Sequence, residues 1–260
     1  VALQPDGKVL IGGGFSNVAG FSRPRFARLG TNGVLDGTLP AITITNGNIF
    51  AIAVAPGGKI LLGGSFRYVN GVARSGVARL NSDGTLDLSF NPGGGATGTV
   101  YTVCALTNGA VFIGGDFTAV NGVARGRYAL LRENGSVDLG FDSSIGADNT
   151  VFAALVTPDQ KIIVGGDFTT IGGQPRRGVA RLNVSEQETL RLSDMRVIAN
   201  SALFRLNSIP GRAYILEGTS NLPYWISLST NLATGATLDF NDPNVLVNGH
   251  RFYRARRFGP

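Results

Sequence analysis

The sequence has little of the side-chain chemistry that catalytic and metal centres use. Its 260 residues include one cysteine, one histidine and one tryptophan. A single cysteine, Cys104, excludes an intramolecular disulfide framework, and its apolar surroundings favour a small buried side chain over a reactive thiol. A single histidine, His250, excludes a metal site built from several histidines. We therefore expect no metal and no cofactor.

The sequence also lacks any apolar run of about 18 residues, so we expect no membrane-spanning segment. Its formal net charge of +6 could suggest a nucleic-acid partner, but the charge is unevenly divided. Residues 1–188 carry +2 and residues 189–260 carry +4. The excess lies largely in one short stretch, at Arg251, Arg254, Arg256 and Arg257. A nucleic-acid footprint usually covers a whole domain face, so we interpret this stretch as a solvated strand and expect no nucleic-acid partner.

Glycine, in contrast, is abundant, and it forms part of an internal repeat. Four glycine-rich tetrads each end in phenylalanine, at Phe15, Phe66, Phe117 and Phe168, spaced by 51 residues without a gap. A period of this length indicates stacked or radially arranged units. Because Val1 aligns with Ile52, the sequence opens inside a strand, and we expect either a small ring or an arc with further units upstream.

Other features recur at the same spacing. Short aliphatic runs bounded by turn residues predict strands, and Asn-Gly or Asp-Gly pairs predict the turns between them. An arginine recurs at Arg23, Arg74, Arg125 and Arg176, and an aspartate at Asp36, Asp87 and Asp138. A catalytic residue is needed once, whereas a residue that fixes geometry is needed in every unit, so we interpret both sets as structural.

Four short antiparallel strands in about 50 residues make up a propeller blade. The sequence therefore predicts an all-β protein in which residues 1–183 form a β-propeller of about four blades, or an incomplete arc of one. The segment 79–90, Arg-Leu-Asn-Ser-Asp-Gly-Thr-Leu-Asp-Leu-Ser-Phe, resembles the delta-60 repeat of bacterial, mostly secreted, β-propeller proteins. The resemblance implies a secreted or cell-surface setting and no established activity. Two departures are Leu130, in place of arginine, and residues 185–188, which lack the turn and the aspartate.

The repeat stops after Leu182, and residues 184–191 form a polar linker. Residues 192–260 contain regularly spaced strand patterns, which predict a small antiparallel β-sandwich. This part resembles a C-terminal β-sandwich module of secreted bacterial proteins, which implies a role in attachment or sorting. Trp225 is either a carbohydrate-stacking platform or, as we favour, a core residue.

Two carboxylates break the repeat and are the candidate site residues. Asp116 and Asp167 stand where the first two units have Gly14 and Ser65. A carboxylate pair can hydrolyse glycosides, but aspartate at such a position commonly caps a turn. We expect a monomeric, non-enzymatic binding or display scaffold for a protein or polysaccharide. The alternative is a carbohydrate-active enzyme that uses Asp116 and Asp167.

Overall fold

The computed structural model describes residues 1–141, 143, 145–183, 192–198, 201–208, 213–235, 237–243 and 252–258. The chain divides into two compact units, Val1–Val184 and Ser185–Pro260. Within the described residues the only helix is one 3-10 turn, Pro56–Gly58, so the predicted all-β class is confirmed. The predicted linker at 184–191 lies outside the described residues.

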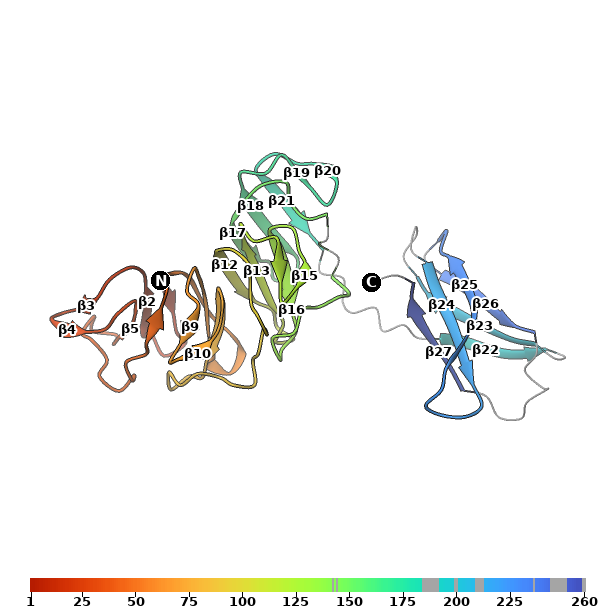
Figure 1. Cartoon of the computed structure of the whole chain (residues 1–260), viewed down its shortest axis with the longest axis horizontal. Coiled ribbons are helices and arrows are strands. Elements are labelled where there is room, and N and C mark those ends of the chain that lie inside the picture. Colours follow the sequence, from red (N-terminus) through yellow and green to blue (C-terminus); the bar gives the residue numbers. More distant parts are fainter. Residues whose placement is uncertain are drawn as a thin grey trace. The chain divides into compact units, whose positions relative to one another are not determined.

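The main sheets of the first unit are four antiparallel sheets of three strands, one for each repeat (Figure 1). Their strands, in blade order, are β1 (Ala2–Leu3), β2 (Val9–Gly12) and β5 (Phe26–Leu29); β7 (Ile49–Val54), β8 (Ile60–Gly64) and β11 (Val77–Leu80); β12 (Val100–Ala105), β13 (Val111–Gly115) and β16 (Tyr128–Leu131); β17 (Val151–Val156), β18 (Ile162–Gly166) and β21 (Val179–Leu182). The second strand lies in the middle of every sheet.

Short two-residue strands extend from each blade between its second and third main strands. They are β3 (Asn17–Val18) and β4 (Phe21–Ser22); β9 (Tyr68–Val69) and β10 (Val72–Ala73), which β6 (Ile44–Thr45) joins; β14 (Ala119–Val120) and β15 (Val123–Ala124); β19 (Thr170–Ile171) and β20 (Gln174–Pro175). The glycine at each tip, such as Gly71 with a φ of 76°, adopts the left-handed conformation that this tight turn requires.

In the first three blades the predicted fourth strand is reduced to a single bridge, and its counterpart in the fourth blade lies outside the described residues. The structure pairs Leu29 with Leu35 in the first blade and Leu80 with Leu86 in the second, and the third blade repeats this arrangement. The aspartate that follows explains why pairing stops. The Asp87 carboxylate accepts a hydrogen bond from the Ser89 backbone N–H at 3.0 Å, which turns the chain away from the sheet.

The hydrophobic cores of this unit lie between blades. One cluster joins the first two sheets and includes Leu10, Phe26, Ile60 and Leu62. Equivalent clusters join the second blade to the third and the third to the fourth. Each sheet therefore has two apolar faces, and a face is buried only where a neighbouring blade covers it.

The glycine pair of each tetrad allows this close packing. A Cβ atom at Gly63 would lie 2.7 Å from Val103 of the next blade. A Cβ atom at Gly115 would overlap the Thr99 carbonyl oxygen, and Gly64 and Gly166 are similarly restricted. A close valine side chain at Gly63, and close backbone carbonyls at the other three positions, require glycine there, and not a special φ angle.

In each of the first two blades a buried ion pair links the third main strand to the turn that follows it. Arg79 donates to Asp87 at 2.7 Å, and Lys59 reaches the same carboxylate at 2.6 Å. Arg28 and Asp36 form the corresponding pair at 2.8 Å in the first blade. In the third blade Leu130 is part of the apolar core, and Asp138 instead lies 3.6 Å from Arg132.

The recurring arginines, which we interpret as structural, donate hydrogen bonds to backbone carbonyls. In each blade this side chain donates to the carbonyl of the residue before it, as Arg74 does to Ala73 at 2.8 Å. Two other arginines, Arg28 and Arg79, pair with the recurring aspartates of the first two blades.

The second unit contains two three-stranded antiparallel sheets, with strand orders β22-β23-β26 and β25-β24-β27. Their strands are β22 (Leu192–Ile198), β23 (Ser201–Asn207), β24 (Ala213–Thr219), β25 (Ile226–Leu232), β26 (Thr237–Asp242) and β27 (Phe252–Arg257). Phe204 and Phe240 of one sheet share a core with Tyr214 and Leu216 of the other. This arrangement is the small sandwich that the strand pattern predicts.

We predict that Gly115→Ala destabilises the first unit by about 2 kcal/mol, because the new methyl group would overlap the Thr99 carbonyl. Gly13 is the matched control at the same repeat position, since a Cβ atom there would meet only Phe15, at 3.4 Å. Urea denaturation followed by circular dichroism measures both variants. Equal losses of stability in Gly115→Ala and Gly13→Ala would contradict this account of the packing.

We predict that Asp87→Asn lowers stability by about 2–3 kcal/mol at neutral pH, because Arg79 keeps a buried charge without its carboxylate. Burial alone would raise the pKa of Asp87, but hydrogen bonds from Lys59, Ser89 and Arg79 outweigh it and hold that pKa well below its usual range. The stabilisation is thus present above the unfolded-state pKa of about 4 and is lost as the pH falls below it.

Thermal unfolding of wild type and Asp87→Asn, followed by circular dichroism from neutral to acid pH, tests this prediction. The difference between the two should shrink as the pH falls below about 4. Trp225, the one tryptophan, lies in the second unit, so its fluorescence transition should be the same in both proteins. A difference that persists unchanged into acid would be the contrary result.

Candidate binding surface

An exposed row of aromatic rings crosses three blades of the first unit. Phe50, Tyr101 and Phe152 occupy the same repeat position on β7, β12 and β17, 51 residues apart. The ring centroids of Phe50 and Tyr101 lie 5.6 Å apart, and those of Tyr101 and Phe152 lie 5.3 Å apart. Phe50 is 52% exposed and Phe152 is 46% exposed. We call these three residues the aromatic row.

A β-bulge places each ring outside the core. The residue before it, Ile49, Val100 or Val151, is buried between the blades. The pairing then shifts register, so that Ile49 pairs with Gly64 while Ala51 pairs with Gly63, and Phe50 between them has no partner in the ladder. The same shift occurs in β12 and in β17. A bulge of this kind re-aims a side chain, and here it turns an aromatic ring outward in three successive blades.

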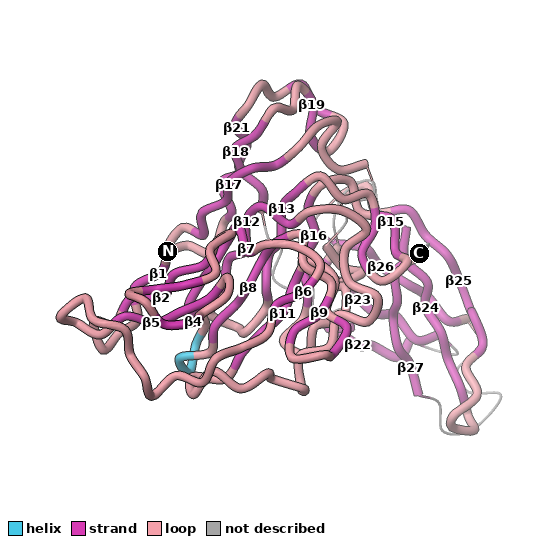
Figure 2. The backbone as a smooth tube through the Cα atoms, turned by 60° about the vertical axis from the view of Figure 1, so that its left-hand side comes forward, coloured by secondary structure: helices cyan, strands magenta, loops and turns pink. Residues whose placement is uncertain are grey.

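The aromatic row lies on the edge where the sheets converge. The first strands β7, β12 and β17 lie side by side, one after another, in Figure 2. Three interlocked blades therefore hold the rings in fixed relative positions. A row of flat apolar surfaces at nearly constant spacing can stack against the apolar faces of sugar rings or of other planar groups.

The candidate carboxylate Asp116 serves a turn in this structure. Its Oδ1 accepts a hydrogen bond from the Thr99 backbone N–H at 2.6 Å, at the start of the first strand. Ser65 does the same in the second blade, where its Oγ accepts from the Asn48 N–H at 3.1 Å. Asp167 occupies the equivalent place in the fourth blade, and its backbone N–H donates to the Thr150 carbonyl at 3.0 Å. The Asp116 carboxylate thus has a defined structural partner.

Trp225 in the second unit lies beneath an ion pair and is only partly buried. The Arg254 guanidinium carbon lies 4.3 Å from the centre of the tryptophan ring, close enough for a cation–π interaction. Arg254 and Arg256 donate to the two oxygens of buried Glu217 at 2.6 and 2.7 Å. The hydrogen bond from Arg256 is the main reason that the pKa of Glu217 is lowered. One ring face of Trp225 is therefore occupied, which differs from the core position favoured by the sequence.

This cluster also accounts for part of the basic stretch in the sequence. Two of its arginines, Arg254 and Arg256, share one carboxylate and support the predicted strand, while Arg251 and His250 lie outside the described residues. Part of the positive charge of this strand is therefore neutralised within the sandwich, by Glu217.

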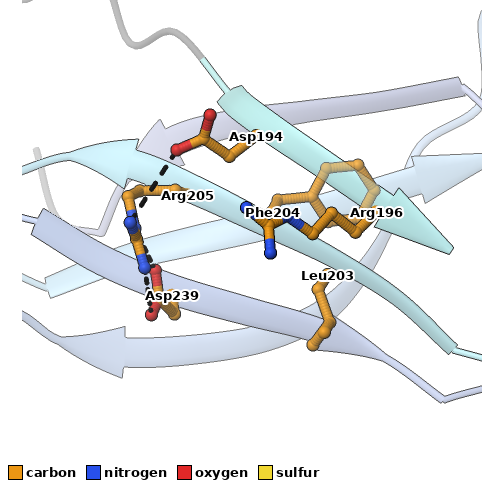
Figure 3. A pocket seen from close by; sticks show the side chains of 6 residues that line it. All are labelled: Asp194, Arg196, Leu203, Phe204, Arg205 and Asp239. Atoms are coloured by element: carbon orange, nitrogen blue, oxygen red, sulfur yellow. Dashed lines mark hydrogen bonds and ion pairs between the residues drawn. The ribbon is translucent and has the colours of Figure 1, made fainter. Parts of the chain in front are cut away.

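A shallow pocket on the sandwich is lined by Asp194, Arg196, Leu203, Phe204, Arg205 and Asp239 (Figure 3). Arg205 makes a two-pronged contact with Asp239, at 2.8 and 3.2 Å, and lies 3.8 Å from Asp194. All three side chains are about half exposed. Exposed ion pairs of this kind contribute little stability, and here the charges satisfy one another.

Neither a metal-binding cluster nor a membrane-spanning helix is found in the part of the chain that the structure describes. Among those residues no cluster of histidine, cysteine, aspartate and glutamate is suited to hold a metal ion. None of the described segments is a helix with the length and apolarity needed to cross a bilayer.

Burial raises the pKa of the Cys104 thiol, whose S–H group donates to the Ala154 carbonyl of the next blade at 3.3 Å. A raised pKa leaves little thiolate at neutral pH.

Comparison with known proteins identifies the repeated unit. No curated protein matches the chain. A family model described as a domain of unknown function (DUF5122) beta-propeller matches residues 4–38, 56–90, 106–141 and 157–185. These four matches cover just over half of the chain and follow the four blades, and none of them reaches the sandwich strands. The chain therefore belongs to the DUF5122 β-propeller family.

Proposed function

We propose that this protein is a rigid, non-enzymatic binding scaffold whose propeller unit binds an extended polysaccharide along the aromatic row. The observation that carries the proposal is the bulge at one repeat position in three blades, which exposes Phe50 and Phe152 and leaves Tyr101 between them partly exposed. Leaving large aromatic rings in water is unfavourable, and a row of them on one edge is typical of a binding surface. Polysaccharides are repeating chains, so a repeating row of stacking surfaces suits them.

The geometry also favours binding over chemistry. The residue before each ring in its strand, such as Val100 or Val151, is fully buried and fixes the strand in place. The rings are therefore already ordered before a ligand binds, so binding costs little conformational entropy. The enzymatic alternative uses two carboxylates, Asp116 and Asp167, and that of Asp116 accepts a hydrogen bond from the protein backbone. A carboxylate engaged in this way is poorly placed to act as a general acid or nucleophile.

We propose further that the protein works outside the cell or on its surface, with the sandwich as an attachment or sorting module. The support is the resemblance of the repeat, and of residues 192–260, to parts of secreted bacterial proteins. Protease treatment of intact cells should then remove the protein, and a chain without residues 185–260 should appear in the medium. Protection of the protein in intact cells, or unchanged retention of the shortened chain, would argue against this setting.

Substitution of the central ring tests polysaccharide binding. We expect Tyr101→Ala to weaken binding about tenfold in affinity electrophoresis and calorimetry with neutral and acidic polysaccharides, because it interrupts the aromatic row in the middle. Tyr68→Ala is the matched control, since Tyr68 is an exposed aromatic residue at a different repeat position. If the wild type binds none of the polysaccharides, or both variants bind equally, this function is wrong.

The same set of polysaccharides separates binding from hydrolysis. We expect no new reducing ends after long incubation with the protein. We also expect Asp116→Ser to remain as stable as wild type, because Ser65 makes the equivalent hydrogen bond in the second blade. Release of reducing ends that Asp116→Ser abolishes would support the enzymatic alternative instead.

A further inference from the structure

We propose that a hollow between the second and third blades binds a guanidinium group, the planar cation of an arginine side chain. The proposal starts from one repeat position, which holds Arg25, Gly76, Arg127 and Gly178 in the four blades. All four residues have a φ between 64° and 73°, the left-handed conformation. Each donates its backbone N–H to the carbonyl of the tetrad phenylalanine, at 2.8–3.0 Å. The backbone is therefore alike in every blade, and only the side chain differs.

Two of these four residues are arginines in a conformation that suits glycine. A left-handed φ brings the Cβ atom of any other residue close to the following carbonyl oxygen, so it is unfavourable for arginine. Such a residue keeps this conformation only where the surrounding structure holds it. The contacts of the Arg25 and Arg127 side chains therefore show what this position binds.

Both arginine side chains donate to oxygen atoms around this position. Arg25 Nη1 donates to the Ile44 carbonyl at 3.0 Å, and its Nε donates to Asn48 Oδ1 at 3.2 Å. Both of these partners precede β7, the first strand of the second blade. Arg127 Nη1 donates to the Asp116 carbonyl of its own blade. The acceptors are thus two backbone carbonyls and one side-chain oxygen.

The counterparts of these three acceptors surround Gly76, between the second and third blades. Two follow from the 51-residue spacing and one from strand pairing, and they are Ser65 for Asp116, Thr99 for Asn48 and Ala96 for Ile44. All three line a hollow of about 170 Å³, together with Gly76 itself. We call it the junction hollow. One water molecule needs only about 10–15 Å³ of such space, so there is room for a group of several heavy atoms.

The junction hollow lies inside the series of four blades. The two blades that form it each have a neighbour on both sides, so its shape does not depend on where the sequence begins or ends. A Cβ atom at Gly76 would lie 3.1 Å from Val100 and 3.4 Å from Ala96, so a side chain here would point at the third blade. Glycine therefore leaves open the space that arginine fills at the same position in two other blades.

A guanidinium group fits the acceptors of the junction hollow. It carries several N–H donors in a rigid planar fork and has no acceptor of its own. Ser65 and Ala96 provide backbone carbonyl oxygens, and Thr99 provides a hydroxyl oxygen that can accept. An ammonium group is a compact point charge without this fork. The hollow is therefore suited to guanidinium compounds more than to simple amines.

One charged side chain also lines the junction hollow. Arg67 is exposed and stands where the other blades have Ser16, Thr118 and Thr169. Its positive charge opposes a second cation but attracts a carboxylate on the same ligand. Free arginine carries both groups, whereas an arginine residue within a polypeptide has no carboxylate of its own. Arg67 therefore provides a way to distinguish these two sources of the guanidinium group.

Titration of the full chain with methylguanidinium, followed by amide chemical shifts in NMR, tests the proposal. At millimolar concentrations, far below those that unfold proteins, we expect saturable shifts confined to the junction hollow, at Gly76 and Thr99 among others. Gly76→Arg should abolish these shifts, because its own side chain fills the hollow. Gly178→Arg is the matched control, since it places the same side chain at a similar φ in the fourth blade. Methylammonium should bind about tenfold more weakly than methylguanidinium.

A second variant opens a hollow instead of filling one. Arg25→Gly removes the side chain between the first and second blades, and glycine suits the φ of 64° at this position, so the variant should fold. It should bind methylguanidinium at one further site, with new saturable shifts near Ile44 and Asn48. Circular dichroism confirms that each variant is folded.

Two larger ligands distinguish the sources of the guanidinium group. Tighter binding of free arginine than of N-acetylarginine amide, with the preference lost in Arg67→Ser, identifies the free amino acid as the ligand. Equal or tighter binding of the amide identifies an arginine residue of a polypeptide. The proposal is overturned if the wild type shows no saturable shifts, if Gly76→Arg leaves them intact, or if folded Arg25→Gly gains no second site.

Discussion

Packing between blades is the constraint on which the propeller unit depends. Each sheet is apolar on both faces, and the three cores of this unit all lie between consecutive sheets. The Gly-Gly-x-Phe tetrad is the part of the repeat that links a blade to both neighbours. Gly63 leaves room for Val103 of the following blade, while Phe66 is buried in the core shared with the preceding one. The regular spacing of the tetrad therefore reflects packing and not a ligand site.

The polar residues of the repeat have two separable tasks. Asp87 both turns the chain, through Ser89, and neutralises buried Arg79. The third blade separates these tasks, because Leu130 replaces the arginine while Asp138 still accepts a hydrogen bond from the Gly140 N–H at 2.9 Å. The turn is thus needed in all three blades, whereas the buried charge can be exchanged for apolar packing, as the cost of burying ions would suggest.

The sequence predicts the blades well, because repetition and apolar patterning are local properties that one chain displays four times. It also predicts the small antiparallel sandwich, because its strand patterns are regularly spaced. The reduction of the fourth strand to one bridge was not predictable, since it depends on where the Asp87 carboxylate finds a hydrogen bond. The sequence alone did not predict the environment of Trp225 either, because Arg254 and Glu217 come from strands far apart in the sequence.

The aromatic row was visible in the sequence as a 51-residue recurrence, but its exposure was not. Phe50 lies in an apolar run that strand alternation alone would bury, and only the pairing register shows that it bulges out opposite Gly63 and Gly64. Glycine on the facing strand has no Cβ atom to block the bulged strand. The glycine pair that packing requires therefore also permits the bulge, and the ring it exposes can change without disturbing the core. The packing of the blades and the exposure of the aromatic row therefore depend on the same two glycines.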